Sequence, residues 1–222
     1  MPFPSFSPDS QWMIFRQGPK WKKVAPGGGP PVNMFDAPQG GAAMAAWGPD
    51  DRLVFGLYPA GMGRMPASGG KLEEVPVVDP KKDERWGGHP QFLPGGKAVT
   101  YGFRTKDVDF FDEYSIAAFS FETRKRKTLI EGGRNAKYLS TGHLIYIRGG
   151  ALYAAPFDAE RLAVTGPSVM VQDGVYQSQT LDGYLWAVSA NGSLAYAPGG
   201  PVGGGRKVVW VHGVSVGEVA LS

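Results

Sequence analysis

Short apolar runs alternate with compact polar turns along this chain, and the alternation repeats five times. The apolar runs are rich in Val, Ile, Tyr and Phe, as in RLVFG (52–56), KAVTY (97–101) and HLIYI (143–147). Such β-branched and aromatic residues are typical of half-buried strands. Because no segment keeps a 3.6-residue apolar period beyond two turns, the pattern predicts an all-β protein.

A turn motif precedes each apolar run. It begins with an apolar or aromatic residue and continues with turn-forming residues. Its five copies are FSPDS (6–10), WGPDD (47–51), FLPGG (92–96), YLSTG (138–142) and VSANG (188–192). The third positions of successive copies are 41, 45, 46 and 50 residues apart. A repeat of this length with four short strands is typical of a β-propeller blade.

The strands of each repeat follow from the position of its turn motif. The segment before the motif supplies a first strand, such as HPQF (89–92), and three strand-like segments follow. We therefore predict an all-β, five-bladed β-propeller of four-stranded antiparallel blades, formed as one domain over residues 1–222. The repeats are expected at about 3–41, 42–86, 87–134, 135–182 and 183–222. The alternative is an open or partial ring that a second chain completes, although a monomer is favoured over a homo-oligomer.

Composition narrows the classes of partner. The chain has no cysteine, which excludes disulfides, thiolate metal sites and a cysteine nucleophile. The net charge of +3 comes largely from Lys20, Lys22 and Lys23 and from residues 124–127. No aromatic residue is interleaved with the basic run 124–127, so nucleic acid is not an expected partner. Membrane insertion is not expected either, because no stretch of about 18 residues is apolar. The N-terminal residues do not have the pattern of a secretory signal.

Two conspicuous polar patterns are interpreted as scaffold. Asp9, Asp50 and Asp51 follow Pro inside the turn motifs, where aspartate bonds its own backbone and initiates a turn. The glycine-rich segments GGGPP (27–31) and GGPVGGGRK (199–207) lack the GxxxxGK[ST] pattern and the helix that a phosphate-binding loop requires. Neither pattern predicts catalysis.

The turn motifs with their strands resemble a known family. FSPDS-QWMIF, WGPDD-RLVFG and FLPGG-KAVTY are similar to the Pro-Asp repeats of TolB-like β-propellers. The longer segments KWKKVAPGGGPPVNMFDAP and GGRNAKYLSTGHLIYIRGGALYAAPFD resemble propellers found C-terminal to bacterial serine/threonine protein kinase domains. This resemblance implies a sensor or interaction module, placed outside the cytoplasm if the chain belongs to a membrane-anchored kinase-type protein. Kinase activity is not expected, because the chain has no HRD, DFG or glycine-rich nucleotide motif.

The candidate site lies in the loops that differ most between repeats. Propellers usually bind ligands with the loops between blades and the loops between second and third strands. In this chain, loops 79–89 and 102–114 supply weak catalytic candidates, namely His89, Asp109, Asp112 and Glu113. Paired carboxylates suit glycoside hydrolysis, and a carboxylate with a histidine suits a divalent metal. No spacing enforces a ligand geometry, so neither a metal site nor a cofactor is predicted.

The same loops and segment 173–184 supply binding candidates, which are Arg85, Trp86, Tyr176, Asp182 and Tyr184. Tyrosine provides contact area with little loss of entropy, which favours recognition. No GxSxG motif marks a serine hydrolase. We therefore expect a non-catalytic module that recognises a protein, a peptide or a small polar ligand with its loop-rich face or central channel. The alternative is a glycosidase- or esterase-type hydrolase with acidic residues at the channel mouth.

Overall fold

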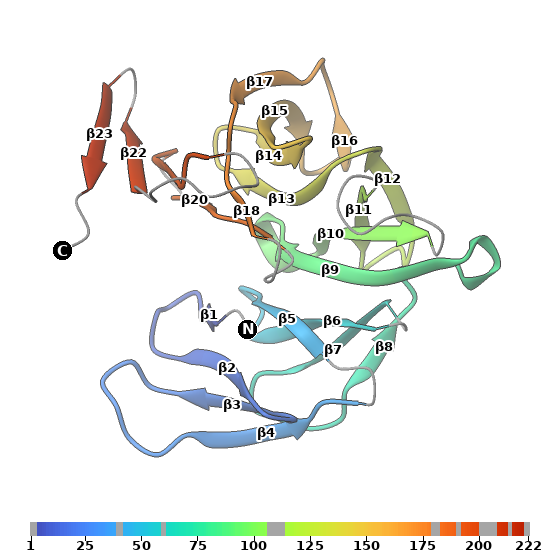
Figure 1. Cartoon of the computed structure of the whole chain (residues 1–222). Coiled ribbons are helices and arrows are strands. Elements are labelled where there is room, and N and C mark those ends of the chain that lie inside the picture. Colours follow the sequence, from blue (N-terminus) through green and yellow to red (C-terminus); the bar gives the residue numbers. More distant parts are fainter. Residues whose placement is uncertain are drawn as a thin grey trace. The chain divides into compact units, whose positions relative to one another are not determined.

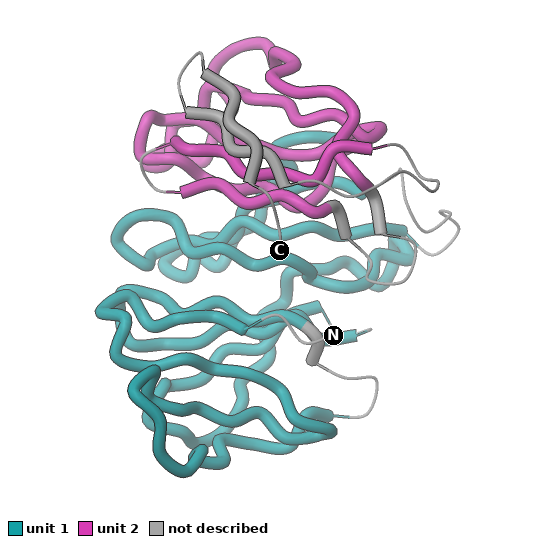
Figure 2. Tube along the Cα trace, turned by 60° about the vertical axis from the view of Figure 1, so that its left-hand side comes forward, with its two compact units in different colours: residues 1–131 teal, residues 132–222 magenta. Residues whose placement is uncertain are grey.

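The computed structural model describes residues 4–38, 42–58, 61–105, 114–178, 183–189, 192–199, 208–212 and 215–219. The chain divides into two compact units, residues 1–131 and 132–222 (Figure 2). The described residues form strands and two short 3-10 helices, which confirms the predicted all-β class. None of the helices in these ranges is long and apolar enough to span a membrane.

The described part of unit 1 contains three antiparallel four-stranded sheets in which strands adjacent in sequence are also adjacent in space (Figure 1). Their strands are β1 (Ser5–Phe6), β2 (Met13–Gln17), β3 (Lys20–Val24) and β4 (Val32–Asp36); β5 (Ala42–Trp47), β6 (Arg52–Leu57), β7 (Gly61–Pro66) and β8 (Glu73–Val75); and β9 (Glu84–Phe92), β10 (Ala98–Thr105), β11 (Ser115–Ser120) and β12 (Arg126–Ile130). The 3-10 helices η1 (Pro80–Lys82) and η2 (Pro94–Gly96) flank β9.

The described part of unit 2 contains two larger sheets and a short hairpin. The first sheet has β13 (Arg134–Leu139), β14 (His143–Arg148), β15 (Ala151–Asp158), β16 (Ala163–Val164) and β17 (Val169–Gln172), and β15 pairs with both β16 and β17. The second sheet has β20 (Trp186–Val188), β21 (Leu194–Tyr196), β22 (Val208–His212) and β23 (Ser215–Val219). The hairpin of β18 (Gln177–Ser178) and β19 (Gly183–Tyr184) lies within the segment expected to be a loop.

The turn motifs connect first and second strands, as predicted. In the second motif, the Asp51 N–H donates to the Gly48 carbonyl over 3.3 Å, and Asp51 has a φ of 54°. In the fourth motif, which lacks Pro-Asp, the Gly142 N–H donates to the Leu139 carbonyl over 3.0 Å. Glycine and aspartate tolerate the left-handed backbone that these turns require. The turn therefore survives where the sequence of the motif changes.

The first strand of the third sheet is longer than predicted. The sequence indicated residues 89–92, whereas β9 begins at Glu84 and pairs with β10 as far as Thr105. Register shifts interrupt this pairing, and Trp86 and His89 have φ values of 64° and 48°. Bulges of this kind absorb extra residues while the ladder continues. The strand signal failed here because WGG does not resemble a regular strand.

Hydrophobic clusters fill the spaces on both faces of the second sheet. Trp21 meets Phe55 edge to face with ring centroids 5.0 Å apart, in a cluster that also holds Leu53 and Met65. Val54 belongs to a different cluster, together with Tyr101 of β10 and other apolar residues of the third sheet. Successive residues of a strand point to opposite faces, so both faces of β6 are buried. This explains why β6 reads as an almost continuous apolar run.

A buried ion pair anchors the start of β9. The Glu84 side chain is 6% exposed and accepts hydrogen bonds from both terminal nitrogens of Arg126, with the Nη2–Oε1 distance at 2.6 Å. The Asp79 N–H donates to Glu84 Oε2 over 2.7 Å, and Arg126 and Tyr101 both donate to the Val77 carbonyl. Hydrogen bonding to Glu84 raises the pKa of Arg126, and burial raises the pKa of Tyr101. These bonds tie the connection between β8 and β9 to the third sheet.

Unit 2 places a half-buried lysine beside an apolar cluster. Ile145 and Ile147 of β14 form a cluster against which Leu139, Trp186 and Tyr196 pack. Lys137 pairs with Ile145 across β13 and β14, so its side chain shares the face that carries Ile145. Desolvation by burial lowers the pKa of Lys137. Within the described ranges, its amino group has no hydrogen-bond or ion-pair partner.

Replacing Arg126 by Met should destabilise the protein by about 3–5 kcal/mol, because the carboxylate of Glu84 would remain buried without a counter-charge. The free energy of unfolding measured by urea titration provides the test. Lys97→Met is the matched control, since Lys97 pairs with Glu122 over 2.9 Å while the two side chains are 69% and 59% exposed. It should cost about 0–1 kcal/mol. Equal losses in the two variants would contradict the anchoring role of Arg126.

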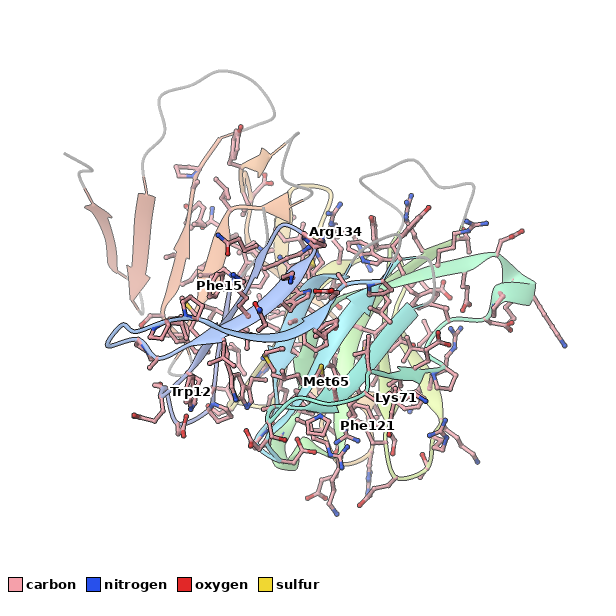
Figure 3. All side chains as sticks on the ribbon, turned by 90° about the horizontal axis from the view of Figure 1, so that it is seen from below. Trp12, Phe15, Met65, Lys71, Phe121 and Arg134 are labelled. Atoms are coloured by element: carbon pink, nitrogen blue, oxygen red, sulfur yellow. The ribbon has the colours of Figure 1, made fainter. Side chains whose placement is uncertain are left out.

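Replacing Lys137 by Met should stabilise the protein near pH 7 by up to roughly 1 kcal/mol, because the variant no longer holds a partly desolvated, unpaired cation beside apolar side chains. The folded-state pKa of Lys137 lies below the ordinary value of 10.5, so the unfolded chain binds more protons between these two values. Wild-type stability should therefore rise with pH in this window, and the advantage of the variant should shrink toward pH 10.5. Unfolding titrations across this range test the prediction. The exposed Lys71 (Figure 3) supplies the control Lys71→Met, for which the difference from wild type should not change with pH.

Candidate functional site

The structure brings two of the predicted site residues into contact. The rings of Trp86 and His89 meet edge to face with centroids 5.9 Å apart. The ring centroid of Tyr114 lies 5.5 Å from that of Trp86, and the His89 N–H donates to Met44 Sδ over 3.3 Å. We call Met44, Trp86, His89 and Tyr114 the aromatic cluster. The sequence analysis did not single out Met44 and Tyr114, because their proximity depends on the packing of β5 and β9.

Glycines hold the aromatic cluster in place. A Cβ atom on Gly87 would lie 2.6 Å from the carbonyl oxygen of Gly61, and one on Gly56 would lie 2.5 Å from that of Gly87. Real Cβ atoms do not approach backbone this closely, so β9 can run against β6 and β7 only with glycine at these positions. Trp86 and His89, on either side of Gly87–Gly88, both have left-handed φ values.

Within the residues that the structure describes, the predicted catalytic residues do not form an acid–base pair. Asp109, Asp112 and Glu113 lie outside the described residues, and His89 packs in the aromatic cluster. Two carboxylates of segment 79–89 stabilise the fold instead: Asp79 accepts the Lys81 N–H at the start of η1, and Glu84 binds Arg126. Within the described ranges, no group of three or more His, Cys, Asp or Glu residues could hold a metal ion.

The predicted binding residues are distributed over both units. Arg85 is half-buried in β9 of unit 1, directly opposite Arg104 of β10, and is followed by Trp86 of the aromatic cluster. In unit 2, the Tyr176 N–H donates to the Ala197 carbonyl over 2.8 Å. Tyr184 lies opposite Gln177 in the β18–β19 hairpin, and Asp182 lies outside the described residues. The structure therefore groups Arg85 with Trp86 and His89 in unit 1.

A pocket that the sequence analysis did not predict lies between the first two turn motifs. Its volume is about 300 Å³, and it is lined by Ser7, Pro8, Asp9, Trp12, Trp47, Gly48, Pro49 and Asp51. We call it the turn-motif pocket. Each motif alone indicates only a turn, but equivalent turns of neighbouring sheets meet at the same end of the strands. A tryptophan beside each of these two motifs, at 12 and 47, was the available signal (Trp12 is labelled in Figure 3).

The aspartates of this pocket form turns as expected, yet each uses only one carboxylate oxygen. Asp9 Oδ1 accepts the Ser7 hydroxyl at 2.6 Å and the Gln11 N–H at 3.0 Å, and these bonds lower the pKa of Asp9. Asp51 Oδ1 accepts the Trp47 indole N–H at 3.0 Å. Within the described part of the chain, the Oδ2 atoms of Asp9 and Asp51 have no hydrogen-bond partner. Two anionic oxygens therefore remain available beside two indole rings.

No protein-family model matches the chain, and no curated protein matches it in sequence. Solved structures do match it. The calcium-binding protein regucalcin from Agrobacterium tumefaciens is 13% identical with a TM-score of 0.67, over 99% of this chain and 72% of that chain. A putative TolB from the same organism is 14% identical with a TM-score of 0.67, over 97% and 78%. A puromycin-hydrolyzing peptidase from Mycobacterium tuberculosis is 13% identical with a TM-score of 0.69, over 99% and 38%.

Similarity at this level of identity establishes the fold and nothing more specific. The neighbours include TolB-like and regucalcin-like proteins, so the chain has a β-propeller fold, as the turn motifs predicted. The number of blades and the resemblance to kinase-associated propellers stay predictions. Since the neighbours include enzymes as well as binding proteins, the fold alone does not select a function.

Proposed function

We propose that this chain is a non-catalytic recognition module that binds a protein, a peptide or a small polar ligand. Its binding surface is centred on the half-buried Arg85 of unit 1, and the aromatic cluster, in which Trp86 is 7% and Tyr114 2% exposed, supports that surface from within the fold. The proposal rests on one observation: the acidic and histidine side chains that segment 79–89 offers for catalysis already bind or pack against other residues of the fold. Glu84 is paired with Arg126, Asp79 caps η1, and His89 packs against Trp86.

Side chains that are already held in an ion pair, a helix cap or a ring contact are poor acid–base catalysts. A general acid or base must reach a substrate proton and change its protonation state near the working pH. Glu84 accepts hydrogen bonds from two guanidinium nitrogens and one backbone N–H, so its carboxylate oxygens are already occupied by groups of the fold. Its side chain is also 6% exposed, so a substrate has little access to it.

The same rigidity favours recognition. Binding costs less entropy when the contacting residues stand on a backbone that is already fixed. The buried rings of Trp86 and Tyr114 are held edge to face, and the glycine-dependent course of β9 fixes the backbone that carries Arg85 and Trp86. Arg85 and Arg104 are half-buried and lie opposite each other across β9 and β10, so they present two cationic groups on this fixed backbone.

Structural similarity to enzymes keeps hydrolysis as the alternative. The similar solved structures include the puromycin-hydrolyzing peptidase, but this chain covers only 38% of that protein. The acids that the alternative would use are Asp109, Asp112 and Glu113, which lie in the segment outside the described residues. Replacing these three acids and measuring hydrolysis therefore distinguishes the two functions.

The wild-type protein should not hydrolyse a panel of chromogenic glycosides and esters faster than the triple variant D109A/D112A/E113A, because segment 79–89 supplies no available acid–base partner for these acids. The test measures initial rates between pH 5 and 8, which is roughly the range over which a histidine changes its charge. A wild-type rate that disappears in the triple variant would overturn the proposal and establish the hydrolase.

Peptides selected on the wild-type protein from a random displayed library should lose affinity when Arg85 is replaced by Ala. The expected loss is at least about tenfold in Kd, which is the value of one lost charged contact of about 1.4 kcal/mol. Lys82→Ala is the matched control, because Lys82 is an exposed cation of the same segment in η1. Its Kd should equal that of the wild type in fluorescence-polarisation titrations. Failure to enrich any peptide, or equal losses in both variants, would contradict recognition at this surface.

A further inference from the structure

The turn-motif pocket lies away from the surface proposed for recognition. It is formed by the turns that join β1 to β2 and β5 to β6, whereas segment 79–89 leads from β8 into β9. In an antiparallel sheet with sequential strand order, these two kinds of connection lie at opposite ends of the strands. A ligand in the pocket would therefore leave Arg85 and the aromatic cluster uncovered.

The charges around the pocket favour a cation. The pocket is lined by the carboxylates of Asp9 and Asp51, each with its Oδ2 unpaired within the described ranges. The third aspartate of the two motifs, Asp50, is not a lining residue and is neutralised by Arg64 at 2.5 Å. The nearby Lys23 donates to the Ala67 carbonyl over 2.9 Å, so its ammonium group is already engaged. The exposed carboxylate of Asp9 is ionised at neutral pH, as any aspartate with a pKa at or below the ordinary 3.8 is, and this charge disfavours an anionic ligand.

The aromatic lining favours an organic cation over a metal ion. Lys23 Nζ lies 5.0 Å from the centroid of the Trp12 ring, so one cation of the protein already contacts this indole, and a ligand cation would share it or use its other face. Trp47 supplies the second indole of the lining, and Pro8 and Pro49 add apolar surface. A volume of about 300 Å³ is at the lower end for small-molecule sites and far exceeds the space that a single metal ion occupies. Two free carboxylate oxygens are also fewer than the six to eight oxygen ligands of Ca²⁺.

We infer that the turn-motif pocket binds an organic cation, namely an alkylammonium or alkylguanidinium group. The exposed carboxylates of Asp9 and Asp51 supply the counter-charge, the half-buried indole of Trp12 contacts the alkyl portion and the charged head, and Trp47, which is 9% exposed, adds only the small part of its ring that lines the pocket. The cation can come from a free small molecule or from a lysine or arginine side chain of a peptide. Both sources present the same chemistry to the pocket.

Isosteric amides separate the ligand role of the aspartates from their turn role. Asp9→Asn and Asp51→Asn keep an Oδ1 acceptor for Gln11 N–H and for the Trp47 indole N–H, and they remove only the charge. Asn also tolerates the φ of 54° at position 51. Asp50→Asn is the matched control, because Asp50 belongs to the same turn and faces Arg64 instead of the pocket.

The experiment titrates the folded protein with n-butylammonium, n-butylguanidinium and n-butanol while the indole N–H resonances of Trp12 and Trp47 are followed by NMR. The two cations should give saturable shifts and the neutral alcohol should not. The D9N/D51N variant should bind the cations at least about tenfold more weakly, and D50N should bind like the wild type. N-acetyl-lysine methylamide and N-acetyl-arginine methylamide form a second arm. Tighter binding of these amides than of the butyl cations identifies a peptide side chain as the source, and weaker binding identifies a free small cation.

Three results would overturn this inference: no saturable shift with either cation, equal binding of n-butanol, or unchanged affinity in D9N/D51N. If the double variant does not fold, the salt dependence of cation binding by the wild-type protein tests the inference instead. Affinity should fall as ionic strength rises from about 0.01 M to 1 M, because the Debye length shrinks from about 30 Å to about 3 Å. Salt-independent binding would also overturn the inference. Arg85→Ala should leave cation binding unchanged, so the outcome is independent of the function proposed above.

Discussion

The close course of β9 against the second sheet is the constraint on which unit 1 depends. Gly56 and Gly87 let β9 approach the backbones of β6 and β7 more closely than any side chain would allow, and this approach places Trp86 and His89 beside Met44. The ion pair of Glu84 and Arg126 fixes the same strand at its start. Steric exclusion and a buried charge pair thus act on one strand, and the aromatic cluster is their consequence.

The repeated turn motifs combine two physical roles. One carboxylate oxygen of Asp9 or Asp51 satisfies donors of its own turn, as a turn-forming aspartate does. The other oxygen is left for solvent or a ligand, and stacking the first two sheets brings both aspartates to the lining of one pocket. A scaffold residue can therefore also supply binding chemistry, at no cost to the turn that it forms.

The sequence predicted the parts of the fold that depend on local patterns. The all-β class, the turns at Gly142 and Asp51, and strands such as β6 and β14 follow from β-forming residues between turn formers. It failed at β9, where bulges at Trp86 and His89 disguise a strand, and it assigned Glu84 to an acidic loop. The partner of Glu84 is Arg126, which lies 42 residues away, so no local pattern could reveal the ion pair.

By itself, the sequence determined the repeat, the turn geometry and the positions at which the repeats differ, because all of these depend on residues close together along the chain. Only the tertiary structure decided which side chains meet. It joined Met44 and Tyr114 to Trp86, it paired Glu84 with Arg126, and it brought Asp9 and Asp51 to the same pocket. These contacts cross from strand to strand and from sheet to sheet. They exist only after the sheets have packed, because the packing alone brings residues from different repeats within contact distance.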